Sequence, residues 1–124
     1  MTKPLALLLH ERLLPGSKLA GRFDELLYRV RTLADPARLV AEAQAGLPMV
    51  IVADLAQRRP EVLAAVTELH ARPETAHIPI IGYLARDDAA ARREAAAAGI
   101  KVVATDTTVV AHLPQFLELA LHVE

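Results

Sequence analysis

Four residues with chemically versatile side chains follow short apolar segments of the sequence. His10 and Glu11 come after the first segment, Asp54 ends the third, and Asp106 comes after the fifth. Carboxylate oxygens are the ligands that Mg²⁺ prefers, and carboxylate and imidazole groups both exchange protons in catalysis. Whether these side chains meet depends on the elements that carry them.

The apolar segments predict five β-strands. Three of them are almost continuously apolar, which is typical of parallel strands covered on both faces. The second differs, because Arg29 and Arg31 alternate with other residues, and this pattern favours an edge strand with one face partly in water. The predicted strands are Leu5–His10, Tyr28–Leu33, Met49–Asp54, Ile78–Leu84 and Lys101–Thr105.

Helical spacing lies between the strands. Pro36 and Pro60 suit the first turns of the second and third helices, and Asp87 or Asp88 can cap a fourth, alanine-rich helix ending at Gly99. We expect Ser17 to cap the first helix after a Pro15-Gly16-Ser17 loop, and Val109 and Val110 to lie in the loop before the last helix. The apolar stripe of that last helix is Leu113, Phe116, Leu117, Ala120 and Leu121.

Five alternating strands and helices, joined by connections too long for hairpins, predict an α/β fold. Right-handed crossovers give a three-layer, doubly wound sheet of five parallel strands in the order 2-1-3-4-5, the flavodoxin-like arrangement, over residues 1–124 as one domain. Ligands of such sheets bind at the carboxyl ends of the strands, between strands 1 and 3. This geometry gathers His10, Glu11, Asp54 and Asp106 at one edge.

Composition excludes several classes of function. The chain has 124 residues, 14 basic and 15 acidic side chains, a formal charge of −1 and no cysteine. Disulfides, cysteine-ligated zinc and iron–sulfur clusters are therefore excluded. A charge near zero argues against direct nucleic-acid binding, and the leucine run at Leu5–Leu9 is too short to span a membrane. We expect a cytoplasmic protein.

Three stretches of the sequence are similar to one known family. They are Tyr28 through Leu55, Arg72 through Ile81, which resembles the family's approach to strand 4, and Ala97-Ala98-Gly99-Ile100, which resembles its turn before strand 5. Together they resemble the receiver domain of two-component response regulators (CheY-like) over nearly the whole chain. The resemblance implies a phosphoacceptor aspartate at Asp54 and an acidic pair, for Mg²⁺, at the position of His10-Glu11.

Several positions depart from the family's pattern. The hydroxyl residue after strand 4 falls on Leu84, the aromatic of strand 5 on Val103, and the lysine after strand 5 on Asp106. Two unit charges about 4–5 Å apart interact by roughly 3–4 kcal/mol at an effective dielectric constant of about 20, so an aspartate in place of the lysine repels a phosphoryl group. Arg58 or Arg86 is expected to pair with Asp54 or Asp106 instead.

These departures favour a degenerate receiver, or pseudo-receiver, that signals by protein interaction without phosphorylation, catalysis or a cofactor. The resemblance implies a partner or homodimer face on helix 4, strand 5 and helix 5, where we expect Ala91, Ala95, Val109 and Val110 to contribute. One alternative is an active phosphoacceptor that uses Asp54 with Mg²⁺ held by Glu11 and Asp54. A further alternative is a small-ligand binder between strands 1 and 3.

Overall fold

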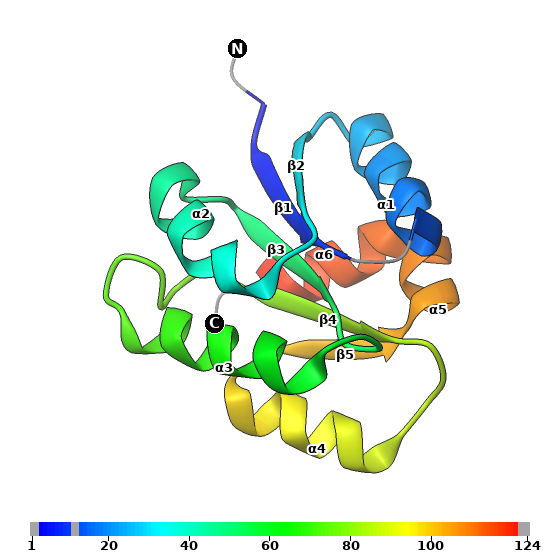
Figure 1. Cartoon of the computed structure of the whole chain (residues 1–124). Coiled ribbons are helices and arrows are strands. Elements are labelled where there is room, and N and C mark those ends of the chain that lie inside the picture. The colour runs from blue at the N-terminus through cyan, green and yellow to red at the C-terminus, as the bar shows by residue number, and fades with distance from the viewer. Residues whose placement is uncertain (1–2, 11–12, 122–124) are drawn as a thin grey trace.

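The structure, a computed structural model, describes residues 3–10 and 13–121. Five parallel strands form one sheet in the order β2-β1-β3-β4-β5 (Figure 1), which confirms the predicted strand order and fold class. The strands begin up to two residues later than predicted. They are β1 (Leu5–Leu9), β2 (Arg29–Leu33), β3 (Val50–Asp54), β4 (Ile80–Leu84) and β5 (Val102–Thr105).

Helices cover both faces of this sheet. One face carries α2 (Leu39–Gly46), α3 (Arg59–Ala71) and α4 (Ala89–Ala98), with a short 3₁₀ turn, η1 (Pro36–Arg38), before α2. The opposite face carries α1 (Leu13–Glu25), α5 (Asp106–Ala111) and α6 (Leu113–Leu121). None of the helices in residues 3–10 and 13–121 is both long and apolar enough to cross a lipid bilayer.

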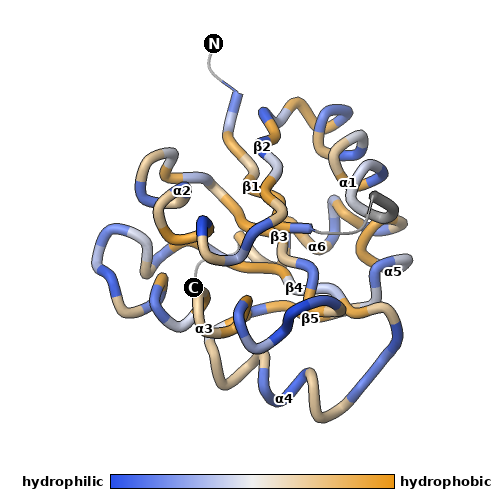
Figure 2. The backbone as a smooth tube through the Cα atoms, in the orientation of Figure 1, coloured by the Kyte–Doolittle hydropathy of each residue, from blue (hydrophilic) through white to orange (hydrophobic). Residues whose placement is uncertain are grey.

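Successive residues of the central strands point to opposite faces and build two apolar layers. In β1, Leu7 and Leu9 join the layer under α2, α3 and α4, whereas Ala6 and Leu8 join the layer under α1, α5 and α6. Figure 2 shows the resulting apolar interior along β1, β3 and β4. The almost continuous apolar runs in the sequence therefore reflect burial on both faces.

Two loop predictions are wrong. The helix α1 already begins at Leu13, so Ser17 lies inside it. Pro15 is tolerated there because it falls in the first turn, where the backbone N–H has no partner within the helix. Val109 and Val110 lie inside α5 and not in a loop. The chain breaks between α5 and α6 near Pro114, which has no N–H to donate to a carbonyl of the preceding turn.

The ends of several helices have well-defined caps. The carboxylate of Asp88 accepts the N–H groups of Ala90 and Ala91 and begins α4, and Gly99, with φ of 109°, ends it as predicted. Leu27 and Leu47 follow α1 and α2 in the same left-handed region, with φ of 66° and 45°. Leucine is a costly choice there, since its Cβ crowds the backbone.

Candidate functional site at the carboxyl ends of the strands

The carboxyl ends of the strands place four of the candidate residues along one edge of the sheet. His10 follows β1, Asp54 ends β3, Leu84 ends β4, and Asp106 follows β5 as the first residue of α5. Pairing between neighbouring strands aligns Leu9 with Ala53, Asp54 with Tyr83, and Leu84 with Thr105. Glu11, the fifth candidate, lies outside the described residues.

Asp54 is deeply buried, with only 2% of its surface exposed. Its Oδ1 atom accepts the N–H of Ala56 at 2.8 Å in a tight local turn. The cavity beside it is lined by Leu9, His10, Pro36 and Val62 among others and has a volume of about 10 Å³. A cavity of that volume holds one water molecule at most.

His10 shares this cavity with Asp54 and is fixed by the first helix. Its backbone N–H donates to the carbonyl of Leu33 at 2.8 Å, which anchors it beside β2. Its imidazole lies over Gly16 of α1 so closely that a Cβ atom at Gly16 would clash with Nδ1. The buried Gly16 therefore makes the room that the ring occupies.

Apolar side chains seal the end of β4. Leu84 is 3% exposed, and Leu55, directly after Asp54, is completely buried. A Cβ atom at Gly82 would lie 2.6 Å from Cδ1 of Leu55, so the leucine fills the space above that glycine. Leu84 therefore presents an apolar side chain at this edge. The hydroxyl residue that the family resemblance expects at this position would supply a hydrogen-bond donor.

The end of β5 carries acidic charge. Asp106 is half-buried in the first turn of α5, a position where the helix dipole favours a carboxylate. Nearby, Arg92 of α4 donates to the carbonyl of Val103 at 2.7 Å and to the carboxylate of Asp87. The hydrogen bond from Arg92 holds the pKa of Asp87 below its usual value.

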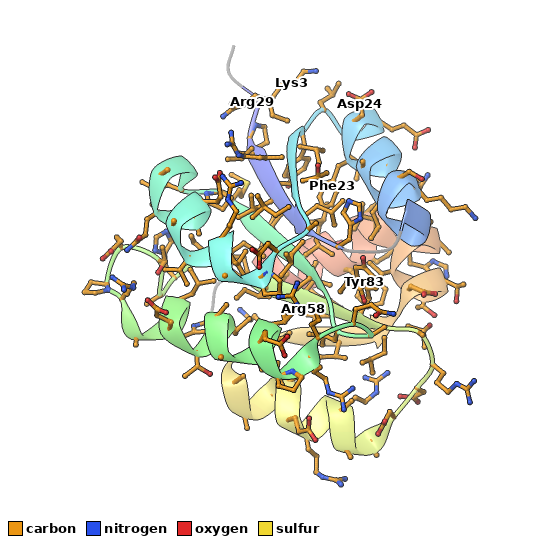
Figure 3. All side chains as sticks on the ribbon, in the orientation of Figure 1. Lys3, Phe23, Asp24, Arg29, Arg58 and Tyr83 are labelled. Carbon is orange, nitrogen blue, oxygen red and sulfur yellow. The ribbon has the colours of Figure 1, made fainter. Side chains whose placement is uncertain are left out.

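The two arginines expected near this edge have different surroundings. Arg58 stands at the start of α3 (Figure 3) with a left-handed φ of 50°, and it pairs with Glu61 at 3.1 Å and with Asp35 at 3.6 Å. Arg86 is exposed in the loop between β4 and α4. Pairing of either arginine with Asp54 or Asp106 stays a prediction.

Asp35 is a residue of this edge that the sequence analysis missed. It follows β2, and its carboxylate accepts the N–H of Ala37 at 3.0 Å and begins η1 while it pairs with Arg58. The available signal was the sequence Asp35-Pro36, an acceptor followed by a proline suited to a first helical turn.

Known structures share the fold of this chain. No protein-family model matches the sequence, and the search of curated proteins found no match. The receiver domain of a sensor histidine kinase from Pseudomonas aeruginosa superposes with a TM-score of 0.85 at 21% identity, over 97% of this chain and 98% of that chain. The chain has the receiver fold. A putative response regulator from Chloroflexus aurantiacus superposes with a TM-score of 0.80 at 18% identity, over 94% of this chain and 98% of that chain. The receiver domain of a modulated diguanylate cyclase from Desulfovibrio desulfuricans gives the same TM-score at 18% identity, over 97% and 94% of the two chains.

The expectation that this edge holds no Mg²⁺ stays a prediction, because Glu11, one of the two expected ligands, lies outside the described residues. The ion prefers six oxygen ligands in an octahedron and keeps several waters. Here Asp54 already accepts a backbone N–H, His10 occupies the neighbouring position, and the cavity between them has about 10 Å³. Within residues 3–10 and 13–121, no three His, Asp or Glu side chains are grouped as a metal site.

The predicted partner face needs a correction. Ala91 and Ala95 of α4 are completely buried and pack on the sheet, and Val109 of α5 is completely buried against the opposite layer. They are small or apolar because they pack in the interior, so they cannot contact a partner. Val110 is half-buried, and the exposed side of α4 carries Arg93, Glu94, Ala96 and Ala97.

Proposed function

We propose that this chain is a receiver-like module of two-component signalling that acts by binding another protein, without phosphorylation of Asp54. The receiver fold supports the signalling class. The observation that carries the phosphate-independent part is the burial of Asp54, whose surface is only 2% exposed.

Charge and donors support the same proposal. A phosphoryl group on Asp54 would be an added anion at an edge that also carries Asp106. The side chain of Leu84 has no hydrogen-bond donor for the oxygens of that phosphoryl group. The cavity lined by Leu9, His10 and Asp54 is also far smaller than the hundreds of cubic ångströms of ordinary ligand pockets, so this cavity does not favour the small-ligand alternative.

The test is incubation with acetyl phosphate and Mg²⁺ followed by intact-mass measurement. We expect no mass increase of one phosphoryl group, and the same sedimentation coefficient with and without the reagent. A receiver of known activity, treated in parallel, shows that the reagent works. A phosphoryl adduct that disappears in Asp54→Asn would overturn the proposal and establish the active-phosphoacceptor alternative.

The exposed side of α4 is the surface that we propose for the partner or for a second copy. Ala97 and Ala96 let another backbone approach closely, and Arg93 and Glu94 can form polar contacts around them. Ala97→Arg should weaken binding or dimer formation in sedimentation equilibrium. Ala64→Arg, at an exposed alanine of α3, is the matched control.

A further inference from the structure

A large groove crosses the amino ends of the strands, at the edge opposite to Asp54. It has a volume of about 1000 Å³ and is lined by residues that immediately precede β1, β3, β4 and β5: Pro4, Met49, Pro79 and Lys101. The groove is therefore a feature of the sheet edge as a whole. Neither the proposed function nor the receiver-like site uses it.

Among the lining residues that the structure describes, the charged side chains are all basic. Lys3, Arg29 and Lys101 contribute three positive charges, and none of the lining residues within the described part of the chain is an aspartate or glutamate. The whole chain, by contrast, has a formal charge of −1. Figure 3 shows Lys3 and Arg29 together near the start of β1, where the guanidinium of Arg29 donates to the carbonyl of Lys3 at 3.2 Å. Asp24 projects at the same end without lining the groove.

Exposed apolar side chains lie between these cations. Leu47 and Met49 line the groove and are 57% and 48% exposed. Leu47 also has the left-handed backbone in which glycine is favoured, so the leucine there costs stability and its side chain gains little from burial. Exposed apolar groups within a groove are typical of an interaction site.

The separation of the cations indicates the shape of the ligand. Arg29 lies on β2 and Lys101 precedes β5, at the two edges of the sheet. Four steps between strands of about 4.8 Å each separate them by about 19 Å, which an extended chain of about six residues spans at about 3.3 Å per residue. A small monocarboxylate cannot reach both ends.

We propose that this groove binds an extended acidic segment of another protein, with carboxylates about six residues apart and apolar side chains between them. The carboxylates would pair with Lys3 or Arg29 at one end and with Lys101 at the other, while Leu47 and Met49 contact the apolar side chains. This proposal stands independently of whether Asp54 is phosphorylated.

The experiment measures fluorescence anisotropy of a labelled heptapeptide, Glu-Leu-Thr-Val-Thr-Leu-Glu, with the full chain. We expect saturable binding that weakens as salt is raised, and loss of binding when both glutamates of the peptide are replaced by glutamine. Arg29→Glu and Lys101→Glu should each weaken binding about three- to tenfold, as reversal of one exposed charge contact allows. Lys18→Glu, at an exposed lysine of α1, is the matched control and should bind like the parent.

A second variant separates binding from folding. Glycine fits the left-handed backbone at this position, so Leu47→Gly should leave the circular dichroism spectrum unchanged. The variant should still bind the peptide more weakly, because it lacks the apolar side chain. Absence of saturable binding, or binding that Arg29→Glu and Lys101→Glu leave unchanged, would overturn the proposal. Binding to phosphatidylserine vesicles without binding to the peptide would also overturn it and indicate an anionic membrane surface.

Discussion

His10 lines the cavity beside Asp54, and its ring packs against Gly16 of α1. The ring occupies the site where the receiver pattern has an acidic residue, and it fits only because Gly16 of α1 lacks a side chain. Two residues from different parts of the chain thus set the position of the ring together. The packing of His10 on Gly16 can be tested through stability.

Gly16→Ala should lower the free energy of unfolding by about 1–2 kcal/mol. The new Cβ displaces the ring of His10, and the cost of this displacement exceeds the gain in helix propensity from alanine. The measurement is urea denaturation. Gly21→Ala in the same helix is the control: nothing lies within 4 Å of its Cβ position, so it should stabilise by up to about 1 kcal/mol. In a chain that also carries His10→Ala, Gly16→Ala should lose most of its destabilising effect. Equal changes in stability for Gly16→Ala and Gly21→Ala would show that the contact between His10 and Gly16 does not matter.

At the scale of elements, the strands were predictable and some helix boundaries were not. Continuous apolar runs marked β1, β3 and β4, and Asp88 and Gly99 marked both ends of α4. The start of α1 was missed because Pro15 and Gly16 together are typical of a loop. The reason for Gly16 is its contact with His10, which no local pattern reveals.

Burial explains the other misplaced element. Val109 and Val110 precede a clear amphipathic helix, so as a short segment they looked like a loop, but α5 packs Val109 completely into the layer beneath α1 and α6. Likewise, the alanines of α4 looked like a smooth outer surface. Sequence spacing alone does not show which side of so uniformly small a helix faces the sheet.

Leu27, after α1, offers a test of helix termination. It is 65% exposed with φ of 66°, so Leu27→Gly should raise the free energy of unfolding by about 1 kcal/mol. Leu119→Gly is the matched control, because Leu119 is 60% exposed inside α6 and glycine there should cost about 1 kcal/mol. Thermal or urea denaturation measures both, and a loss of stability in Leu27→Gly would contradict the argument.

At the scale of the whole molecule, the order of the strands predicts a pattern of amide hydrogen exchange. The N–H of Arg29 donates to Pro4, and residues two apart in a strand point their N–H groups to the same side. The amides of Val30 and Thr32 therefore point away from β1, at the open edge, and should exchange much faster than that of Arg31.

The comparison is made by nuclear magnetic resonance in deuterated buffer, with the amides of β3, the central strand, as the slow reference. Protection of Val30 and Thr32 equal to that of β3 would mean that another strand covers β2. The sequence anticipated this edge through its alternating arginines. The groove at the amino ends was not foreseen, because Lys3, Arg29 and Lys101 are remote in the chain and meet only through the fold.

The arginines of β2 have one more consequence. Arg31 pairs with Glu42 of α2 at 2.6 Å, and Arg29 is exposed beside it on the same strand. A strand from a second molecule could add to the outward N–H groups only by stripping water from these guanidinium groups. We therefore expect the open border of the sheet to resist the strand addition by which fibrils grow, so that the protein stays unpolymerised along that border when it is concentrated.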